Sequence, residues 1–240
     1  MPPAHREASR EVCDGTTWTI VVAGGSGTRL GRTKQYELIG GQRVVDVAMA
    51  VAARCSDGVV LVVPAADVEC ERARPRDSHT VVVGGGPTRS ASVTAGLAAV
   101  PDDASIVCVH DAARPFASDA LFTRVVSAVR DGADGAVPGV AVTDTVKRVD
   151  ADRVVLETPP RANLFAVQTP QAFRAAILRA AYANGDEGTD DSAVVERVGG
   201  RVVVVAGDER NRKITHADDL EWARSQLTGP DDAPVTAGAR

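Results

Sequence analysis

The 240-residue sequence predicts a single α/β domain that contains a mostly parallel sheet with flanking helices. Hydrophobic residues make up 44% of the chain, enough for a sizeable core, while aromatic residues contribute only 3%. The hydrophobic residues are mainly Val and Ala, in short Val-rich runs that alternate with Ala-rich stretches. A buried parallel sheet covered by helices has this pattern, because its strands are apolar on both faces.

Six apolar runs predict the strands, and the stretches between them predict the helices. The first run ends in glycines, so we expect a buried strand that enters a tight loop. Strand–helix alternation at this spacing is typical of right-handed crossover units. The predicted strands are residues 18–23, 58–63, 80–83, 105–110, 135–140 and 201–205, and the predicted helices are residues 44–54, 89–100, 118–129, 171–183, 191–198 and 217–227.

The alternation breaks at residues 143–157, where β-branched residues are mixed with charges. Residues 150–152 suit a turn, so this stretch predicts a hairpin that protrudes as a β-arm over residues 143–161. Such an arm is exposed on both faces and needs a partner to bury its valines. The domain is predicted to span residues 16–228, between disordered tails at residues 1–15 and 229–240.

Charge and cysteine content exclude several classes of protein. The formal net charge is −5, so no nucleic-acid partner is expected, and any anion site must be local. The cysteines show no metal-ligand spacing and are expected to be reduced thiols. No signal-peptide pattern and no run of about 20 apolar residues is present, so we expect a cytoplasmic protein with no membrane partner. The cysteines are Cys13, Cys55, Cys70 and Cys108.

A glycine-rich loop follows the first predicted strand, where open α/β sheets bind their ligands. It contains Gly24, Gly25 and Gly27, and the basic residues Arg29 and Lys34 come next. Clustered glycines let backbone N–H groups surround a phosphate, and cations complete its neutralisation. The spacing fits neither the P-loop nor the dinucleotide fingerprint. We favour a phosphate-binding loop over an ordinary turn.

A second glycine-rich loop follows the third predicted strand. Gly84 and Gly85 lead into the helix that carries Ser92, whose hydroxyl could bind a base, ribose or phosphate. The alternative is an ordinary turn with hydroxyls that cap the helix.

Charged residues follow two further strands. Asp111 directly follows the fourth predicted strand, and a carboxylate beside a phosphate loop is a natural Mg²⁺ ligand. The alternative for Asp111 is a salt bridge with Arg114 in the same loop. Lys213 follows the last strand and should reach the same edge, unless it belongs to a solvated charge run.

Seven short motifs occur in an order that resembles one known family. Together they resemble the 2-C-methyl-D-erythritol 4-phosphate cytidylyltransferase family, over residues 17–227. The motifs are the first glycine loop with Arg29 and Lys34-Gln35, Gly84-Gly85 with Arg89-x-x-Ser92, His110-Asp111-Ala112-Ala113-Arg114, Asp144-Thr145-Val146-Lys147, Gln168-Thr169-Pro170-Gln171, Thr189-Asp190-Asp191, and Asn211-x-Lys213-Ile214-Thr215.

The resemblance implies a Rossmann-like nucleotidyltransferase that joins CMP from CTP to a polyol phosphate, with Mg²⁺ as cofactor. It also implies a homodimer in which the arm reaches the neighbour's acceptor site. No nucleophile–base constellation is expected, since the attacking phosphate is already largely ionised at neutral pH. The implied roles are Arg29, Lys34 and Lys213 for catalysis, Ala23, Gly24, Gly25, Gly27, Gly84, Gly85 and Ser92 for the nucleotide, and Asp111, Arg114, Thr145, Arg161 and Thr189 for the acceptor, with Asp111 also at the metal.

The stretch from Arg29 to Lys34 is two residues shorter than the family's usual pattern, with Thr33 in place of a Pro. The loop must bend differently, so either Lys34 reaches the phosphates or Arg32 substitutes for it. Three other functions stay open on the sequence. They are a cytidylyltransferase for ribitol 5-phosphate or another alditol phosphate, a sugar-1-phosphate nucleotidyltransferase that uses another base, and a catalytically weak paralogue that binds nucleotide.

Overall fold

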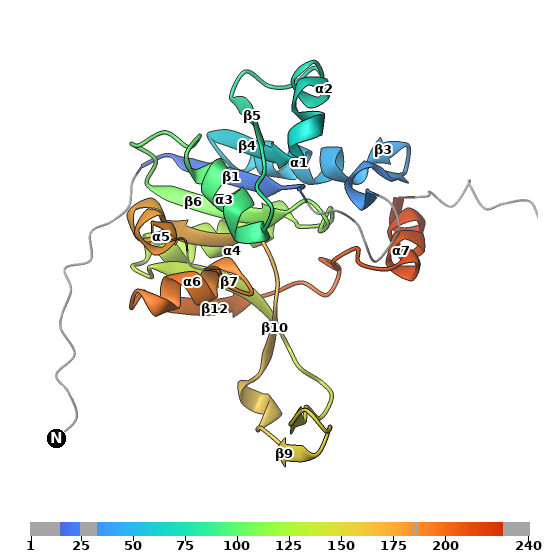
Figure 1. Ribbon diagram of the computed structural model, residues 1–240, viewed down its shortest axis with the longest axis vertical. Helices are drawn as coiled ribbons and strands as arrows, with labels where there is room; N and C mark the ends of the chain where they lie inside the picture. The colour runs from blue at the N-terminus through green and yellow to red at the C-terminus, as the bar shows by residue number, and fades with distance from the viewer. Residues whose placement is uncertain (1–14, 25–32, 184, 186, 228–240) are drawn as a thin grey trace, which may run out of the picture.

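A computed structural model describes residues 15–24, 33–183, 185 and 187–227 (Figure 1). An eight-stranded sheet runs through the body in the order β10-β7-β11-β6-β1-β4-β5, and β12 pairs with the other side of β7. Six strands run parallel, which confirms the predicted mostly parallel α/β sheet. They are β1 (Thr17–Val22), β4 (Gly58–Val63), β5 (Thr80–Gly84), β6 (Ile106–Asp111), β7 (Gly135–Ala141) and β12 (Val202–Ala206).

Two antiparallel strands were not predicted. β10 (Phe165–Val167) pairs with β7, and β11 (Gln171–Arg174) lies between β6 and β7. The predicted helix over residues 171–183 is therefore wrong in its first four residues. The strand is imposed by its two neighbours, and Phe173 is fully buried against them, so tertiary pairing overrides the local helical pattern.

Helices cover both faces of the sheet, as predicted. One face packs on α1 and α4, and the other packs on α3, α5 and α6. Adjacent residues of β1 serve opposite faces, with Val21 in the first cluster and Ile20 in the second. The helices are α1 (Val44–Arg54), α2 (Val68–Arg72), α3 (Arg89–Leu97), α4 (Asp119–Arg130), α5 (Ala175–Tyr182), α6 (Asp191–Arg197) and α7 (Ala217–Leu227).

Side-chain caps begin the two helices, α3 and α6, whose first turns lie beside the site. The Thr88 hydroxyl accepts a hydrogen bond from the Ala91 N–H at 3.1 Å and begins α3. The Asp190 carboxylate accepts from the Ala193 N–H at 3.0 Å and begins α6. Each cap satisfies an otherwise free backbone N–H and fixes where the chain turns into the helix.

A small third cluster attaches α7 to the body. Ile39, Val44, Ile214, Leu220 and Ala223 pack together and are all buried. The short elements nearby are the 3₁₀ turns η1 (Lys34–Tyr36) and η2 (Ala65–Asp67) and the paired strands β2 (Leu38–Ile39) and β3 (Gln42–Arg43). Lys34 is thus carried on a turn that precedes a firmly packed segment.

The predicted hairpin is present and extends away from the body as an arm (Figure 1). It contains β8 (Arg148–Val149), β9 (Val155–Glu157) and the 3₁₀ turn η3 (Arg161–Asn163). Most of the two predicted tails lie outside the described residues. None of the helices in the described ranges has the length and apolar character needed to cross a membrane.

Candidate active site

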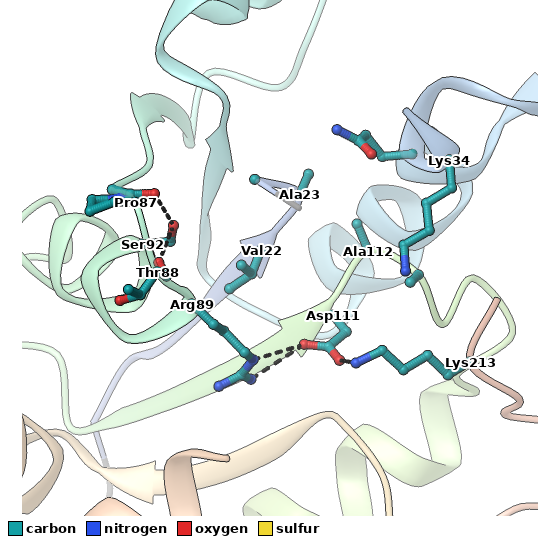
Figure 2. A pocket seen from close by; sticks show the side chains of 14 residues that line it. Val22, Ala23, Lys34, Pro87, Thr88, Arg89, Ser92, Asp111, Ala112 and Lys213 are labelled. Carbon is teal, nitrogen blue, oxygen red and sulfur yellow. Dashed lines mark hydrogen bonds and ion pairs between the residues drawn. The ribbon is translucent and has the colours of Figure 1, made fainter. Parts of the chain in front are cut away.

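The first of two hollows opens at the carboxyl edge of the sheet, between the end of β1 and the start of α3. Its volume is ≈ 300 Å³. It brings together residues from five separate parts of the chain (Figure 2). The residues predicted from sequence that line it are Ala23, Gly24, Lys34, Ser92, Asp111 and Lys213.

The second glycine loop lies against this hollow through residues that follow the predicted pair. Residues 86–88 line the hollow, whereas Gly84 and Gly85 are not among its described lining. Gly85 lies behind them, where a Cβ would stand 2.7 Å from the Ser92 hydroxyl. Ser92 itself donates to the Thr88 carbonyl at 3.0 Å, and Thr88, rather than Ser92, caps the helix.

A second hollow lies beside the first and has a volume of ≈ 260 Å³. Arg114 and Thr189, both predicted acceptor residues, line it together with Gln168, Thr169 and Gln171. The Arg114 guanidinium is held by the Asn211 carbonyl at 2.8 Å. Three residues, Arg89, Asp111 and Lys213, line both hollows and form the wall that the two hollows share.

Asp111 is the centre of this shared wall. Lys213 Nζ donates to its Oδ2 at 2.6 Å, while Arg89 Nε and Nη2 each lie 3.3 Å from its Oδ1. Figure 2 shows the two cations approaching the carboxylate from opposite sides. The alternative Asp111–Arg114 salt bridge is therefore wrong, because the cations in contact with Asp111 are Arg89 and Lys213.

The shared wall keeps Asp111 ionised. Burial alone would raise the pKa of this carboxyl, but the charges of Arg89 and Lys213 outweigh burial and hold the pKa well below its usual value. The wall therefore presents one permanent carboxylate between two cations. Such an arrangement can orient hydroxyl groups and neutralise phosphate groups at the same place.

Sequence reasoning missed Arg89 and Asp191 as members of the site. Arg89 Nη2 lies 2.7 Å from Asp191 Oδ2, and the Asp191 side chain is fully buried. The sequence did contain a signal for both residues, because Arg89 and Asp191 each belong to one of the seven motifs on which the family resemblance rests. Their contact was not predictable, since the two residues are 102 positions apart.

His110 lies directly under the wall and is fully buried. Its Nε2 lies 3.1 Å from the Arg114 carbonyl, which can only accept, so we assign the proton to Nε2. Nδ1 then accepts from the Thr169 hydroxyl at 3.1 Å. Burial lowers the pKa of His110 to about 4, so the ring is neutral and structural.

Lys34 reaches the first hollow despite the shortened segment before it. The 3₁₀ turn that carries it is held by Tyr36, whose hydroxyl donates to Asp67 at 2.7 Å. The guanidinium of Arg43 lies 5.4 Å from the centre of the Tyr36 ring. The other predicted phosphate contacts, Gly25, Gly27 and Arg29, and the possible substitute Arg32, lie outside the described residues.

Two predicted acceptor residues lie on the arm instead. Thr145 and Arg161 are exposed and are not among the described residues that line either hollow. Arg161 donates to the Thr143 carbonyl at 2.7 Å within the arm. Within one subunit, the chain does not bring them to the site.

The residues fit a magnesium ion only in combination with substrate phosphates. No group of three or more His, Cys, Asp or Glu side chains in the described ranges could hold a metal ion. Asp111 offers one carboxylate at the wall of both hollows. Mg²⁺ is commonly bound by one or two carboxylates together with phosphate oxygens, so a single carboxylate is sufficient there.

Two neighbouring hollows that share charged residues, at the carboxyl edge of a mostly parallel sheet, are the arrangement a nucleotidyltransferase needs to bind a nucleotide beside an acceptor. The sequence profile of 2-C-methyl-D-erythritol 4-phosphate cytidylyltransferase matches residues 17–229. The chain belongs to this family.

Similar proteins agree with this assignment. A 2-C-methyl-D-erythritol 4-phosphate cytidylyltransferase from Nocardia farcinica is 47% identical and covers 89% of this chain and 95% of its own length. A bifunctional enzyme from Nitratidesulfovibrio vulgaris is 44% identical, but this chain spans only 56% of it. The crystal structure of 4-diphosphocytidyl-2C-methyl-D-erythritol synthase from Anaerococcus prevotii has a TM-score of 0.79 at 31% identity and covers 89% of this chain and 98% of its own.

Proposed function

We propose that the protein transfers CMP from CTP to 2-C-methyl-D-erythritol 4-phosphate and releases pyrophosphate. The observation that carries this proposal is the family match over residues 17–229, together with two hollows that share a wall of cations. The first hollow would hold CTP, because it lies at the two glycine-rich loops. The second would hold the acceptor, because Arg114 and Thr189 line it.

The reaction requires alignment and positive charge rather than a general base. An oxygen of the acceptor phosphate attacks the α-phosphorus of CTP and forms a new P–O bond, and the bond from the α-phosphorus to the bridging oxygen breaks. Pyrophosphate leaves with that electron pair, and no proton must be removed from the nucleophile. Lys34 and Lys213 would stabilise the negative charge that builds up on the phosphates, and we propose the same role for Arg29.

Magnesium is part of the proposal. Asp111 would be the protein's contact to an ion that arrives with the triphosphate, and the bound ion would neutralise charge on the phosphate oxygens. Asp111 would also orient the acceptor's hydroxyls. The carboxylate is ionised and lies at the boundary of the two hollows, which supports both roles.

A homodimer formed through the arm completes the proposed site. Val154, Val155 and Leu156 on the arm are 60%, 54% and 53% exposed, so a partner is needed to bury them. In the dimer, Thr145 and Arg161 would reach the acceptor phosphate in the neighbouring subunit. We also propose a cytoplasmic location, where CTP is made.

The decisive test is pyrophosphate release by purified protein with CTP and Mg²⁺, with 2-C-methyl-D-erythritol 4-phosphate and ribitol 5-phosphate assayed in parallel. Preference for the first acceptor is the expected result. Preference for ribitol 5-phosphate would keep the chemistry and change the substrate. If CTP raised the melting temperature but neither acceptor reacted, the protein would be a nucleotide-binding paralogue.

A further inference from the structure

A row of polar contacts runs from Tyr182, at the end of α5, to Asp111 in the shared wall. The Tyr182 hydroxyl donates to Asp191 Oδ1 at 2.6 Å. Asp191 accepts from Arg89 Nη1 at 3.0 Å and from Arg89 Nη2 at 2.7 Å. Arg89 in turn reaches Asp111 Oδ1. Three helices and the end of β6 are thus connected behind the two hollows.

Packing does not account for this row. The helices α3, α5 and α6 already share an apolar cluster that includes Val93, Leu97, Leu178 and Val194. A fully buried carboxylate such as Asp191 contributes little net stability even when it is paired, because its desolvation offsets the attraction. The row therefore calls for a role other than holding the helices together.

The geometry fixes the orientation of one guanidinium group. Two nitrogens of Arg89 bind the two oxygens of Asp191, and this bidentate pairing sets the plane of the group. Its Nε and Nη2 then converge on Asp111 Oδ1, which leaves Oδ2 to Lys213 at 2.6 Å. The direction of the Asp111 carboxylate is thus determined by a residue that lines neither hollow.

The segment before Asp191 belongs to the second hollow. Thr189 and Asp190 line that hollow, and Asp190 is held by Gln171 Nε2 at 2.9 Å. Asp191 therefore joins the acceptor side of the site to Arg89. A substitution of Asp191 should therefore affect alignment of the acceptor more than binding of the nucleotide.

We propose that Asp191 and Tyr182 are positioning residues for acceptor alignment, acting through Arg89 on the Asp111 carboxylate. Neither residue touches substrate in this proposal, which rests on the function proposed above. Arg89 transmits the orientation, and Asp111 presents it to the acceptor.

The test uses two substitutions that preserve shape. Asp191→Asn removes the charge that orients Arg89, and Tyr182→Phe removes only the hydroxyl that orients Asp191. We expect Asp191→Asn to lower kcat/KM for the acceptor by about 10²-fold, as small misplacements at active sites do. Tyr182→Phe should lower it less, and in both variants the KM for CTP should change far less than kcat/KM for the acceptor, although Asp111 also lines the first hollow.

Asp134→Asn is the matched control. Asp134 precedes β7 at the opposite edge of the sheet, where it lies 3.9 Å from Arg174 Nε. The same carboxylate-to-amide change there should leave both KM values and kcat unaltered. The inference would be overturned if the Asp191 and Tyr182 variants lost kcat/KM equally for CTP and for the acceptor, in proportion to the loss of folded protein.

A crystal structure of the Asp191→Asn variant gives a second readout that needs no activity. Rotation of Arg89 away from Asp111 supports the inference, and an unmoved Arg89–Asp111 contact refutes it. If the wild-type enzyme used no acceptor, the proposed function would fail while this structural comparison still decided the positioning.

Discussion

Lys213 is one side chain that lies at both proposed substrate sites. Its ammonium group binds Asp111 and lines both hollows, yet 42% of the side chain is exposed. A partly exposed lysine contributes little to folding, so its contact with a carboxylate in the shared wall supports the role proposed for Lys213 in the reaction.

We expect Lys213→Ala to lower kcat by about 10²- to 10³-fold, which is typical when one group that stabilises developing charge is removed. The free energy of unfolding should change little, because Arg89 still pairs with Asp111. Steady-state kinetics and urea denaturation measure the two effects. Arg210→Ala, an equal loss of charge at an exposed position nearby, should leave kcat at the wild-type value. Wild-type turnover in Lys213→Ala would remove this residue from the mechanism.

Several members of the site were predictable because their position follows from topology. Asp111 and Lys213 each come after a parallel strand, and the carboxyl ends of such strands share one edge. Lys34 follows the first loop in the same way. Arg89 and Asp191 were not predictable as a pair, because only the folded chain brings the first residue of α3 to the first residue of α6, 102 positions away in sequence.

At the scale of single elements, the arm and β11 illustrate opposite outcomes. The arm was predictable, because alternating β-branched and charged residues around a turn fit a hairpin. β11 was not, because Gln171–Arg174 runs without interruption into the helical pattern of α5. Strand formation there depends on pairing with β6 and β7, and both of these strands are distant from β11 in the sequence.

A charge on the arm tests the proposed homodimer. We expect Val155→Asp to convert a dimer to a monomer in sedimentation velocity, because a carboxylate would have to be buried at the interface. Circular dichroism should stay native, since Val155 is 54% exposed within one subunit. Val198→Asp, at an exposed position at the end of α6, should remain dimeric. A Val155→Asp protein that stayed dimeric would place the interface elsewhere.

The proposed position of the arm at the acceptor site also predicts that a substitution in the arm changes the KM of one substrate selectively. Arg161→Ala should raise the KM for the acceptor far more than the KM for CTP, because the guanidinium would bind the acceptor phosphate of the neighbouring subunit. Initial rates with each substrate varied in turn measure both values. An effect confined to CTP would contradict the assignment of the arm to the acceptor site.

At the scale of the whole molecule, buried polar groups lie close beneath the site. His110, Thr169, Gln171, Asp191 and Asn211 are all buried at the carboxyl edge. The side chain of each of these residues makes at least one hydrogen bond, although Oδ1 of Asn211 has no partner among the described residues. Because His110 is one of these buried groups, the region beneath the candidate site also makes the stability of the fold depend on pH.

Global stability should fall as pH decreases from about 6.5 to 4, because an unfolded histidine with a pKa near 6.5 takes up a proton in that range. Folded His110 does not, since burial lowers its pKa to about 4. The contribution of His110 to the free energy of unfolding is fully present above pH 6.5 and amounts to about 3 kcal/mol at most. Urea denaturation across this range measures it.

His110→Asn should have a flatter pH dependence of stability than the wild type. His79 is 74% exposed in its side chain, so the curve for His79→Asn should parallel the wild-type curve. Equal slopes for the wild type and His110→Asn would show that the imidazole does not contribute.

The wall between the two hollows has a thermodynamic consequence. Arg89, Asp111 and Lys213 line both hollows, so in the proposed site the first substrate to bind changes the groups that the second one meets. The affinities of CTP and acceptor are then linked, and each must alter the other's dissociation constant by the same factor. The coupling between the two substrates is thereby a property of three side chains, and calorimetric titration under conditions without turnover must give the same coupling free energy with either substrate first.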